Sequence, residues 1–292
     1  MFTDLHLHTS HSDGKLSVKE TIDIAFKKKV DLISITDHDT ISGINEAIQY
    51  SYSKGLICIS GIELSCRNEN ASVAFPQDVS IHLLGYNINY HSSELQDYLN
   101  RYHAERTRIL LKLISELVVN DLNINYKKID VIAGKQMRVQ DIINYISSHP
   151  ICSKKKQLYI NIAKRYYLKL LYEDCPLQMA IKLIKNSGGI SVLAHPFFSY
   201  RDYDVEFNSR SSVINLLDYL CDLGLDGIEA FYPKNTNEQT NFLQNEAQKR
   251  KLFVTAGSDF HGTTLRQQMM DYNIADIEET TKYLLKVNHY KP

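Results

Sequence analysis

Apolar and polar residues alternate along most of this chain in a regular way. Short apolar runs, typical of buried strands, are each followed by a segment with the apolar spacing of an amphipathic helix. The predicted strands are residues 5–8, 30–36, 56–62, 79–87, 190–193, 227–231 and 253–256. The predicted helices are residues 16–29, 41–54, 176–188, 213–223 and 237–250. Strands that alternate with helices favour an α/β fold with a parallel sheet, for which a barrel is the natural closure.

This alternation stops in the middle of the chain. A helical pattern runs from residue 93 to about residue 119, and residues 138–147 and 160–171 also have helical spacing. Strong strand patterns are missing there. We therefore expect a discontinuous α/β domain formed by residues 1–99 and 179–292, interrupted by a helical insertion at residues 100–178.

The composition is that of an ordinary globular protein. The 292 residues are 43% hydrophobic and 23% charged, with a net charge of −1, so general electrostatic attraction to nucleic acid or membrane is not expected. The apolar runs are far shorter than the ~20 residues that cross a bilayer, and the first residues do not resemble a signal peptide. The five cysteines are odd in number and form no CxxC pair, which favours free thiols in a reducing compartment, so we expect a cytoplasmic protein. The sequence indicates no protein partner.

Six of the eleven histidines lie at or near the ends of apolar, strand-like segments. They are His6, His8, His38, His82, His195 and His261. Three carboxylates accompany them: Asp13 in a Ser-Asp-Gly turn, Glu63 at the end of an apolar run, and Asp259 two residues before His261. Imidazole and carboxylate together bind Zn, Mn and Fe. Because nine such groups exceed what one ion can use, the sequence predicts a site for two or three divalent metal ions.

Each of these pieces also has an ordinary explanation when it is taken alone. His6 and His8 can reach one ion because residues two apart in a strand point to the same side, but they could equally face solvent. His38 could be a ligand whose neighbouring aspartates support the turn, or an ordinary histidine beside a helix-capping aspartate. Glu63 would be costly to bury alone, so it requires either a salt bridge or a metal, and a carboxylate can bridge two ions.

Taken together, the motifs resemble those of the PHP (polymerase and histidinol phosphatase) superfamily of metal-dependent phosphoesterases. In chain order they are HxH, SDG, TDH, GxE, HLLGY, AHP and GSDFHG, and they run from His6 to Gly262. The resemblance is closest to the stand-alone bacterial branch that includes nucleoside 3',5'-bisphosphate phosphatases and enzymes that trim RNA ends. It implies a distorted seven-stranded (β/α)7 barrel with a helical insertion that covers the active site.

The same resemblance implies how the ligands are shared. One metal takes His6, His8, Glu63 and Asp259; a second shares Glu63 and adds His82 and His195; a third takes Asp13, His38 and His261. It also implies that a metal-bound hydroxide, held by way of Glu63 and Asp259, is the nucleophile, with no separate side-chain nucleophile.

The substrate is where the sequence departs from the family pattern. The connection between Glu63 and His82 is longer than expected, and the phosphate-binding segment of the insertion keeps only Arg138. Arg138 is the first candidate for a phosphate contact, and Arg201, which follows the AHP motif, is the second. We expect a phosphatase acting on a small phosphorylated metabolite, with a nucleoside 3',5'-bisphosphate favoured.

Other functions stay open at this point. The nearest is a phosphodiesterase that hydrolyses a cyclic phosphate or trims short RNA from its 5' end, followed by histidinol phosphatase. A metal-dependent amide hydrolase and a non-catalytic module are less favoured, because Arg138 is present, no ligating lysine is evident and no expected ligand is missing.

Overall fold

The computed structural model describes residues 2–70, 80–119, 142–143, 146, 153–198, 209–262, 272–273 and 277–287. Arg138 and Arg201, the two predicted phosphate contacts, lie outside the described residues. The chain divides into two compact units, Met1–Gln96 with Cys175–Pro292, and Asp97–Asp174. The placement of the insertion over the active site stays a prediction.

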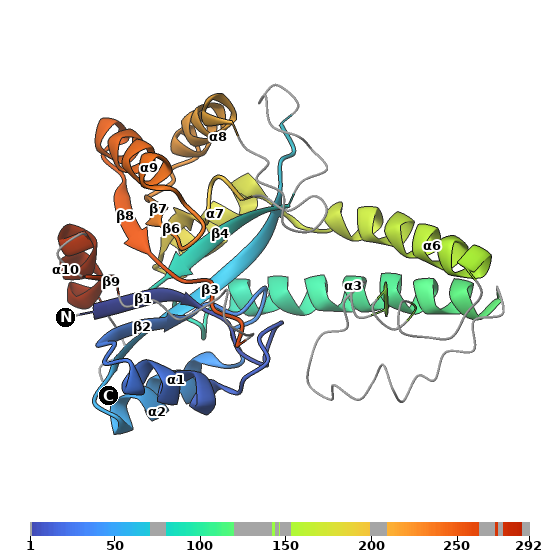
Figure 1. Ribbon diagram of the computed structural model, residues 1–292, viewed down its shortest axis with the longest axis horizontal. Coiled ribbons are helices and arrows are strands. Elements are labelled where there is room, and N and C mark those ends of the chain that lie inside the picture. Colours follow the sequence, from blue (N-terminus) through green and yellow to red (C-terminus); the bar gives the residue numbers. More distant parts are fainter. Residues whose placement is uncertain are drawn as a thin grey trace. The chain divides into compact units, whose positions relative to one another are not determined.

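The first unit is built around one β-sheet, with helices packed against its strands. Its strands are β1 (Phe2–Leu7), β2 (Leu32–Ile35), β3 (Ile57–Arg67), β4 (Ser80–Tyr86), β5 (Cys175–Pro176), β6 (Ile190–Leu193), β7 (Gly227–Phe231), β8 (Phe253–Ala256) and β9 (Tyr272–Asn273). Its helices are α1 (Val18–Lys27), α2 (Ile44–Ser53), α7 (Leu177–Asn186), α8 (Arg210–Asp222), α9 (Asn237–Arg250) and α10 (Glu278–Lys286). Helices α1 and α2 lie together on one side of β1–β3, and α9 packs against β7 (Figure 1).

The strands form one mixed sheet, in the order β8-β7-β6-β4-β3-β2-β1-β9, with β5 beside β3. The predicted α/β class is correct, but the expectation of a closed parallel barrel is not met. In the described part of the chain β8 does not form a ladder with β1; a single bridge between Leu7 and Phe260 links the two ends. Strand β8 ends at Ala256, before the chain reaches the bridge at Phe260.

Two strands give the sheet its mixed character: β4 is antiparallel to both β3 and β6, and β9 is antiparallel to β1. No helix is described between β3 and β4, so β4 does not run in the same direction as its neighbours. The reversal also places His82. It lies near the start of β4, and that end of an antiparallel strand lies beside the carboxyl ends of its neighbours. His82 therefore reaches the same edge of the sheet as the other candidate ligands.

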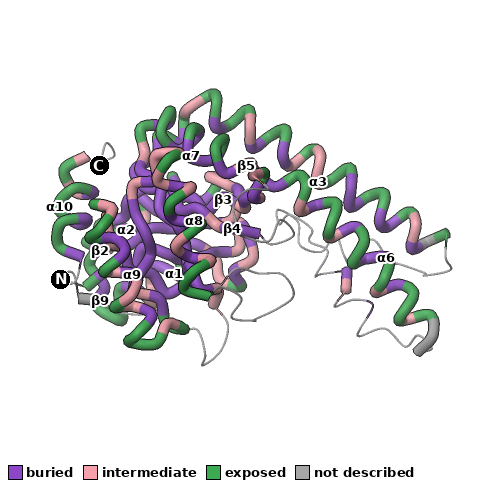
Figure 2. The backbone as a smooth tube through the Cα atoms, turned by 90° about the horizontal axis from the view of Figure 1, so that it is seen from above, coloured by how far each residue is buried: buried purple, intermediate pink, exposed green. Residues whose placement is uncertain are grey.

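The strands of the sheet share one hydrophobic core. One buried cluster collects side chains from most strands, among them Leu5, Leu32, Ile59, Leu84 and Val192. Figure 2 shows the strands of this unit as largely buried and the outer sides of its helices as exposed.

The second unit has a core of its own. Helix α3 (Ser93–Val119) begins in the first unit and continues through the second, where α6 (Ser153–Leu171) also lies. Their apolar faces form one buried cluster that includes Leu113, Leu117, Tyr159 and Ala163. In the described ranges, neither these helices nor any other combines the length and apolarity needed to cross a bilayer.

Candidate metal centre

The nine predicted ligand residues converge on one place, and Glu63 lies at its centre. One carboxylate oxygen of Glu63, Oε2, is 3.1 Å from Nε2 of His6, from Nε2 of His8 and from Nδ1 of His38. His6 comes from β1, His8 from the residue after it, and His38 from the turn after β2. The backbone of His38 also forms a bridge with that of Glu63. The ends of two strands, β1 and β2, thus bring three imidazoles to a single oxygen of Glu63.

The other oxygen of Glu63 faces a different pair of imidazoles. Its Oε1 lies 3.0 Å from Nδ1 of His82 and 3.1 Å from Nε2 of His195. A carboxylate whose two oxygens face separate groups of imidazoles is arranged to bridge two cations. The family resemblance implied a position of this kind, shared between two metals, for Glu63.

Asp259 is the second carboxylate of the site. Its Oδ1 lies 3.2 Å from Nε2 of His8, 3.6 Å from Nε2 of His6 and 3.4 Å from Nδ1 of His261. Its other oxygen, Oδ2, accepts a hydrogen bond of 3.1 Å from the hydroxyl of Tyr232. Tyr232 therefore holds Asp259 in one orientation.

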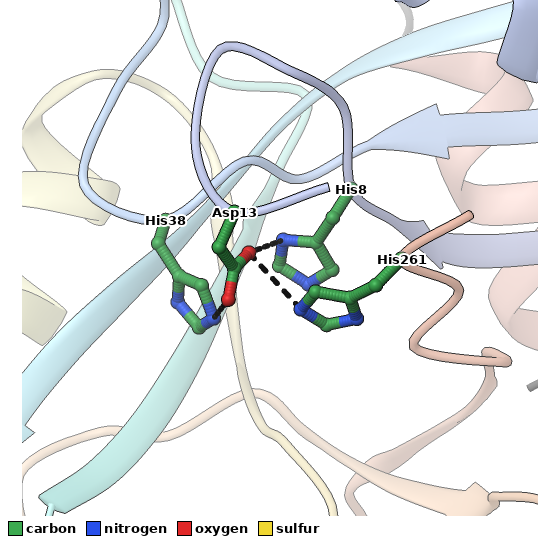
Figure 3. A group of neighbouring side chains, drawn as sticks. All are labelled: His8, Asp13, His38 and His261. Carbon is green, nitrogen blue, oxygen red and sulfur yellow. Dashed lines mark ion pairs between the residues drawn. The ribbon is translucent and has the colours of Figure 1, made fainter. Parts of the chain in front are cut away.

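Asp13 forms the third acidic point. In Figure 3 it lies between His38 on one side and His8 and His261 on the other. Its oxygens are 3.0 Å from Nε2 of His261, 3.6 Å from Nδ1 of His8 and 4.0 Å from Nε2 of His38. This group joins the loop after β1, the turn after β2 and the turn after β8.

The centre is closed at one end and open at the other. The side chains of His6 and Glu63 are fully buried, whereas those of Asp13, His38 and His261 are 17%, 22% and 16% exposed. Among the described residues of the centre, those around Asp13 are therefore the more exposed.

The potential ligand atoms are better placed to bind metal ions than to form hydrogen bonds with one another. Nε2 of His6, Nε2 of His8, Nδ1 of His38 and Oε2 of Glu63 are all buried, yet none makes a well-formed hydrogen bond. Such groups are costly to bury unless something satisfies them. Among the described residues, three groups have potential ligand atoms within 4.8 Å of one another. They are His8–Asp13–His38–His261, His6–His8–Glu63–Asp259, and His38–Glu63–His82. The residues therefore fit a centre with more than one divalent ion.

The shifted pKa values of the buried histidines and carboxylates show that the site attracts positive charge. Burial lowers the pKa of His8, but Asp259 and Glu63 outweigh it and raise that pKa to about 10. Burial raises the pKa of Glu63, but the imidazoles around it, His38 first, hold it well below its ordinary value. At His38 burial dominates and lowers the pKa to about 3, which leaves a neutral imidazole with a lone pair for a cation. Protons or metal ions must supply the positive charge.

Sequence reasoning missed Glu229, which supports two of the histidines. This fully buried residue lies in β7; its Oε1 is 3.0 Å from Nδ1 of His6, and its Oε2 accepts a 2.8 Å hydrogen bond from the backbone N–H of His195. The bond fixes the tautomer of His6, because Nδ1 carries the proton and Nε2 is left for a cation. The signal was present in the sequence as one carboxylate inside an apolar strand.

Two further aspartates support the site: Asp4 was missed by sequence reasoning, and the role of Asp37 was left open. Asp4 is buried, accepts a 2.9 Å hydrogen bond from the N–H of Ser258, and has its pKa raised by burial to about 7. Asp37 accepts hydrogen bonds from the backbone and hydroxyl of Thr9 and from the hydroxyl of Ser12. Asp37 therefore orders the loop that carries Asp13, which was one of the two alternatives for the aspartates beside His38.

The backbone at the site adopts unusual conformations. His195 and Asp259 have positive φ values of 27° and 54°, which cost energy for residues other than glycine. Gly257 permits a close approach, since a Cβ there would lie 2.2 Å from Cβ of His6 and 2.6 Å from Oε1 of Glu229. The GSDFHG motif thus needs its first glycine for packing against His6.

Comparison with known proteins identifies the family. The PHP domain family matches residues 4–184, more than half of the chain. The chain belongs to the PHP domain family. It is accordingly a metal-dependent phosphoesterase of the PHP type, and the family and enzyme class predicted from the motifs are confirmed.

Relatives of this PHP protein have different named activities. It is 27% identical over 263 residues to a 5'-3' exoribonuclease of Haemophilus influenzae, covering 88% of this chain and 89% of that protein. It is 25% identical to a phosphoribosyl 1,2-cyclic phosphate 1,2-diphosphodiesterase of Eggerthella lenta, covering 90% and 95%. It is also 25% identical to a 3',5'-nucleoside bisphosphate phosphatase of Chromobacterium violaceum, covering 88% and 86%.

A solved structure shares the fold. A protein from Bifidobacterium adolescentis, assigned as a metal-dependent phosphoesterase, superposes with a TM-score of 0.75 at 22% identity, covering 99% of this chain and 96% of that one.

Proposed function

We propose that this PHP protein hydrolyses one phosphate monoester of a nucleoside 3',5'-bisphosphate and releases inorganic phosphate. The observation that carries the proposal is the geometry of Glu63, whose two oxygens face two separate sets of imidazoles at distances of 3.0–3.1 Å. A bridging carboxylate of this kind suits a multi-metal site for phosphoryl transfer. A relative of similar length is named for this substrate.

The side chains are assigned to three metal positions. His6, His8, Glu63 and Asp259 would hold one ion; Glu63, His82 and His195 a second; and Asp13, His38 and His261 a third. When bound, these ions would activate water and stabilise negative charge on phosphate oxygens. Three divalent ions against three carboxylates leave a positive surplus, which suits a dianionic phosphate.

Other residues of the chain orient this set. Tyr232 fixes the direction of Asp259 through its 3.1 Å hydrogen bond, and Glu229 fixes the tautomer of His6. Burial of His6 and Glu63 keeps bulk water from the closed end, which strengthens electrostatic interactions there. The reacting phosphate would enter at the partly exposed end near Asp13. Arg138 is proposed as a further phosphate contact, with Arg201 second.

A second candidate is the trimming of short RNA from its 5' end. It is favoured by the likeness to the Haemophilus influenzae exoribonuclease, which is of similar identity and coverage. A net charge of −1 provides no general attraction for a long polyanion, so RNA would have to be recognised near the site. Hydrolysis of a cyclic phosphate, as in the named activity of the Eggerthella lenta relative, uses the same phosphoester chemistry.

A substrate panel separates these functions. Mn-loaded protein is assayed with 3'-phosphoadenosine 5'-phosphate, AMP, a ribose 1,2-cyclic phosphate, histidinol phosphate and a short 5'-phosphorylated RNA, with His195→Ala as the control. The proposal expects fastest phosphate release from the bisphosphate and its loss in the variant. Nucleotide release confined to the RNA would favour the second candidate. No phosphoester cleavage by metal-loaded protein would contradict both.

A further inference from the structure

Arg67, at the end of β3, is an arginine without an evident structural role. Among the described residues its guanidinium forms no hydrogen bond or ion pair, and its Nε is buried from solvent. A buried donor without an acceptor is destabilising, and an arginine carries both a charge and five N–H donors. Arginines with a structural role normally have an acidic or carbonyl partner, so the lack of such a partner in the described part of the chain requires an explanation.

Arg67 projects from the same face of the sheet as the metal ligands. Strands β3 and β4 pair in continuous register from Gly61–Tyr86 to Arg67–Ser80, and Ser65 lies opposite His82. Side chains alternate along a strand, and directly opposite residues share a face. Glu63, Ser65 and Arg67 are therefore on one face together with His82. About 13 Å of strand separates Glu63 from Arg67, at ~3.3 Å per residue.

The backbone that carries Arg67 is held from both sides. Arg67 lies opposite Ser80 of β4 and opposite Pro176 of β5. Two residues later, the carboxylate of Glu69 accepts hydrogen bonds of 3.0 and 3.4 Å from the N–H groups of Leu177 and Gln178 at the start of α7. A side chain on a fixed strand end loses little conformational freedom of its backbone when it binds a ligand.

From this arrangement we propose that Arg67 binds a second anionic group of the substrate, one nucleoside unit away from the phosphate at the metal centre. This inference rests on the proposed function and names a residue that selects for doubly phosphorylated substrates. Guanidinium binds phosphate through two parallel hydrogen bonds, which suits an arginine that has no other partner among the described residues. The second group would be the non-reacting phosphate of a nucleoside bisphosphate or the next phosphodiester of a 5'-phosphorylated dinucleotide; both have the same chemistry at this point.

The test compares ligands that differ by one phosphate. Binding of adenosine 3',5'-bisphosphate and of AMP to the metal-loaded full-length protein is measured by calorimetry, together with kcat/KM for phosphate release. The variants are Arg67→Met, which keeps the length without the charge, and Arg67→Lys, which keeps the charge without the planar fork. Arg210→Gln is the matched control, because Arg210 is an exposed arginine on α8 that pairs with Glu238.

We expect the preference for the bisphosphate over AMP to fall about ten- to hundredfold in Arg67→Met, from the strength of a charge-assisted bidentate contact. The fall should be partial in Arg67→Lys and absent in Arg210→Gln. Thermal unfolding of the ligand-free protein provides an independent readout. Removing an unsatisfied buried donor should leave the Tm of Arg67→Met equal to or above that of the wild type.

Two results would overturn the proposal. An unchanged preference in Arg67→Met would show that the second phosphate does not contact Arg67. A Tm lower by several degrees, with both ligands weakened equally, would show that Arg67 is structural. If the wild type binds the bisphosphate through Arg67 but releases no phosphate, the proposed function fails and the subsite stands. Replacing the bisphosphate with a 5'-phosphorylated dinucleotide then shows which source of the second anion is preferred.

Discussion

Replacement of Glu229 by glutamine should weaken metal binding while leaving the fold intact. Glu229 is fully buried and serves two donors, Nδ1 of His6 at 3.0 Å and the backbone N–H of His195 at 2.8 Å. A glutamine side chain can accept one of these hydrogen bonds, but its NH₂ group must then face the other donor. The variant also removes a negative charge that favours a metal ion on His6.

The expected size of this effect follows from the contacts that are lost. Loss of residues that support metal ligands costs about 10- to 100-fold in metal affinity, which corresponds to about 1.4–2.8 kcal/mol. The affinity is measured by competition with a chromogenic chelator, using Mn and Zn separately. Glu238→Gln is the control, because Glu238 is a glutamate of α9 whose side chain is 86% exposed.

A particular pattern of results would refute this reasoning. If Glu229→Gln binds metal as tightly as the wild type, the support given to His6 and His195 is unimportant. If affinity and the Tm of the chelator-treated protein fall together, the residue stabilises the fold in general and does not act through its two histidines.

Three further predictions concern packing, orientation and pH. Gly257→Ala should lower the free energy of unfolding by about 1–3 kcal/mol in urea denaturation, because its Cβ would lie 2.2 Å from Cβ of His6; unchanged stability would show that the strands can separate there. Tyr232→Phe should fold normally, with kcat/KM reduced about tenfold, because the hydrogen bond to Asp259 contributes about 1.5 kcal/mol; wild-type kinetics would contradict its orienting role. In chelator-treated protein the pKa of His8 is raised to about 10 in the folded state. Protonation of His8 therefore contributes its full stabilisation below pH ~6.5, the pKa of an unfolded histidine, and this contribution is lost as the pH rises toward 10. The Tm should fall over that interval, and metal affinity should rise with pH as the imidazole is deprotonated; a Tm independent of pH would contradict the His8 assignment.

Most of the candidate site could be predicted from the sequence because most of the candidate ligands carry a local signal. His6 and His8 alternate in a strand, and Asp259 and His261 follow directly after one, so chain order alone collects them at strand ends. Glu63 was included because a lone carboxylate at the end of an apolar run is costly. The same argument applies to Glu229, which was nevertheless missed because its partner His6 is 223 residues away and no histidine stands beside it.

The sheet could be predicted only in part, since strand direction and closure depend on distant pairing. The apolar pattern locates β4 but does not show that it runs antiparallel to β3 and β6. Nor does it show that the chain after β8 meets β1 through one bridge and not a ladder.

The most direct test of the account is the number of metal ions per chain, measured by mass spectrometry on the preparation used for phosphatase assays. The account predicts three ions per active wild-type chain. It also predicts that Glu63→Gln loses at least two of them together with activity, because Glu63 faces two groups of imidazoles. Full activity with fewer than three ions per chain, or a Glu63→Gln variant that keeps all of its metal, would contradict the account.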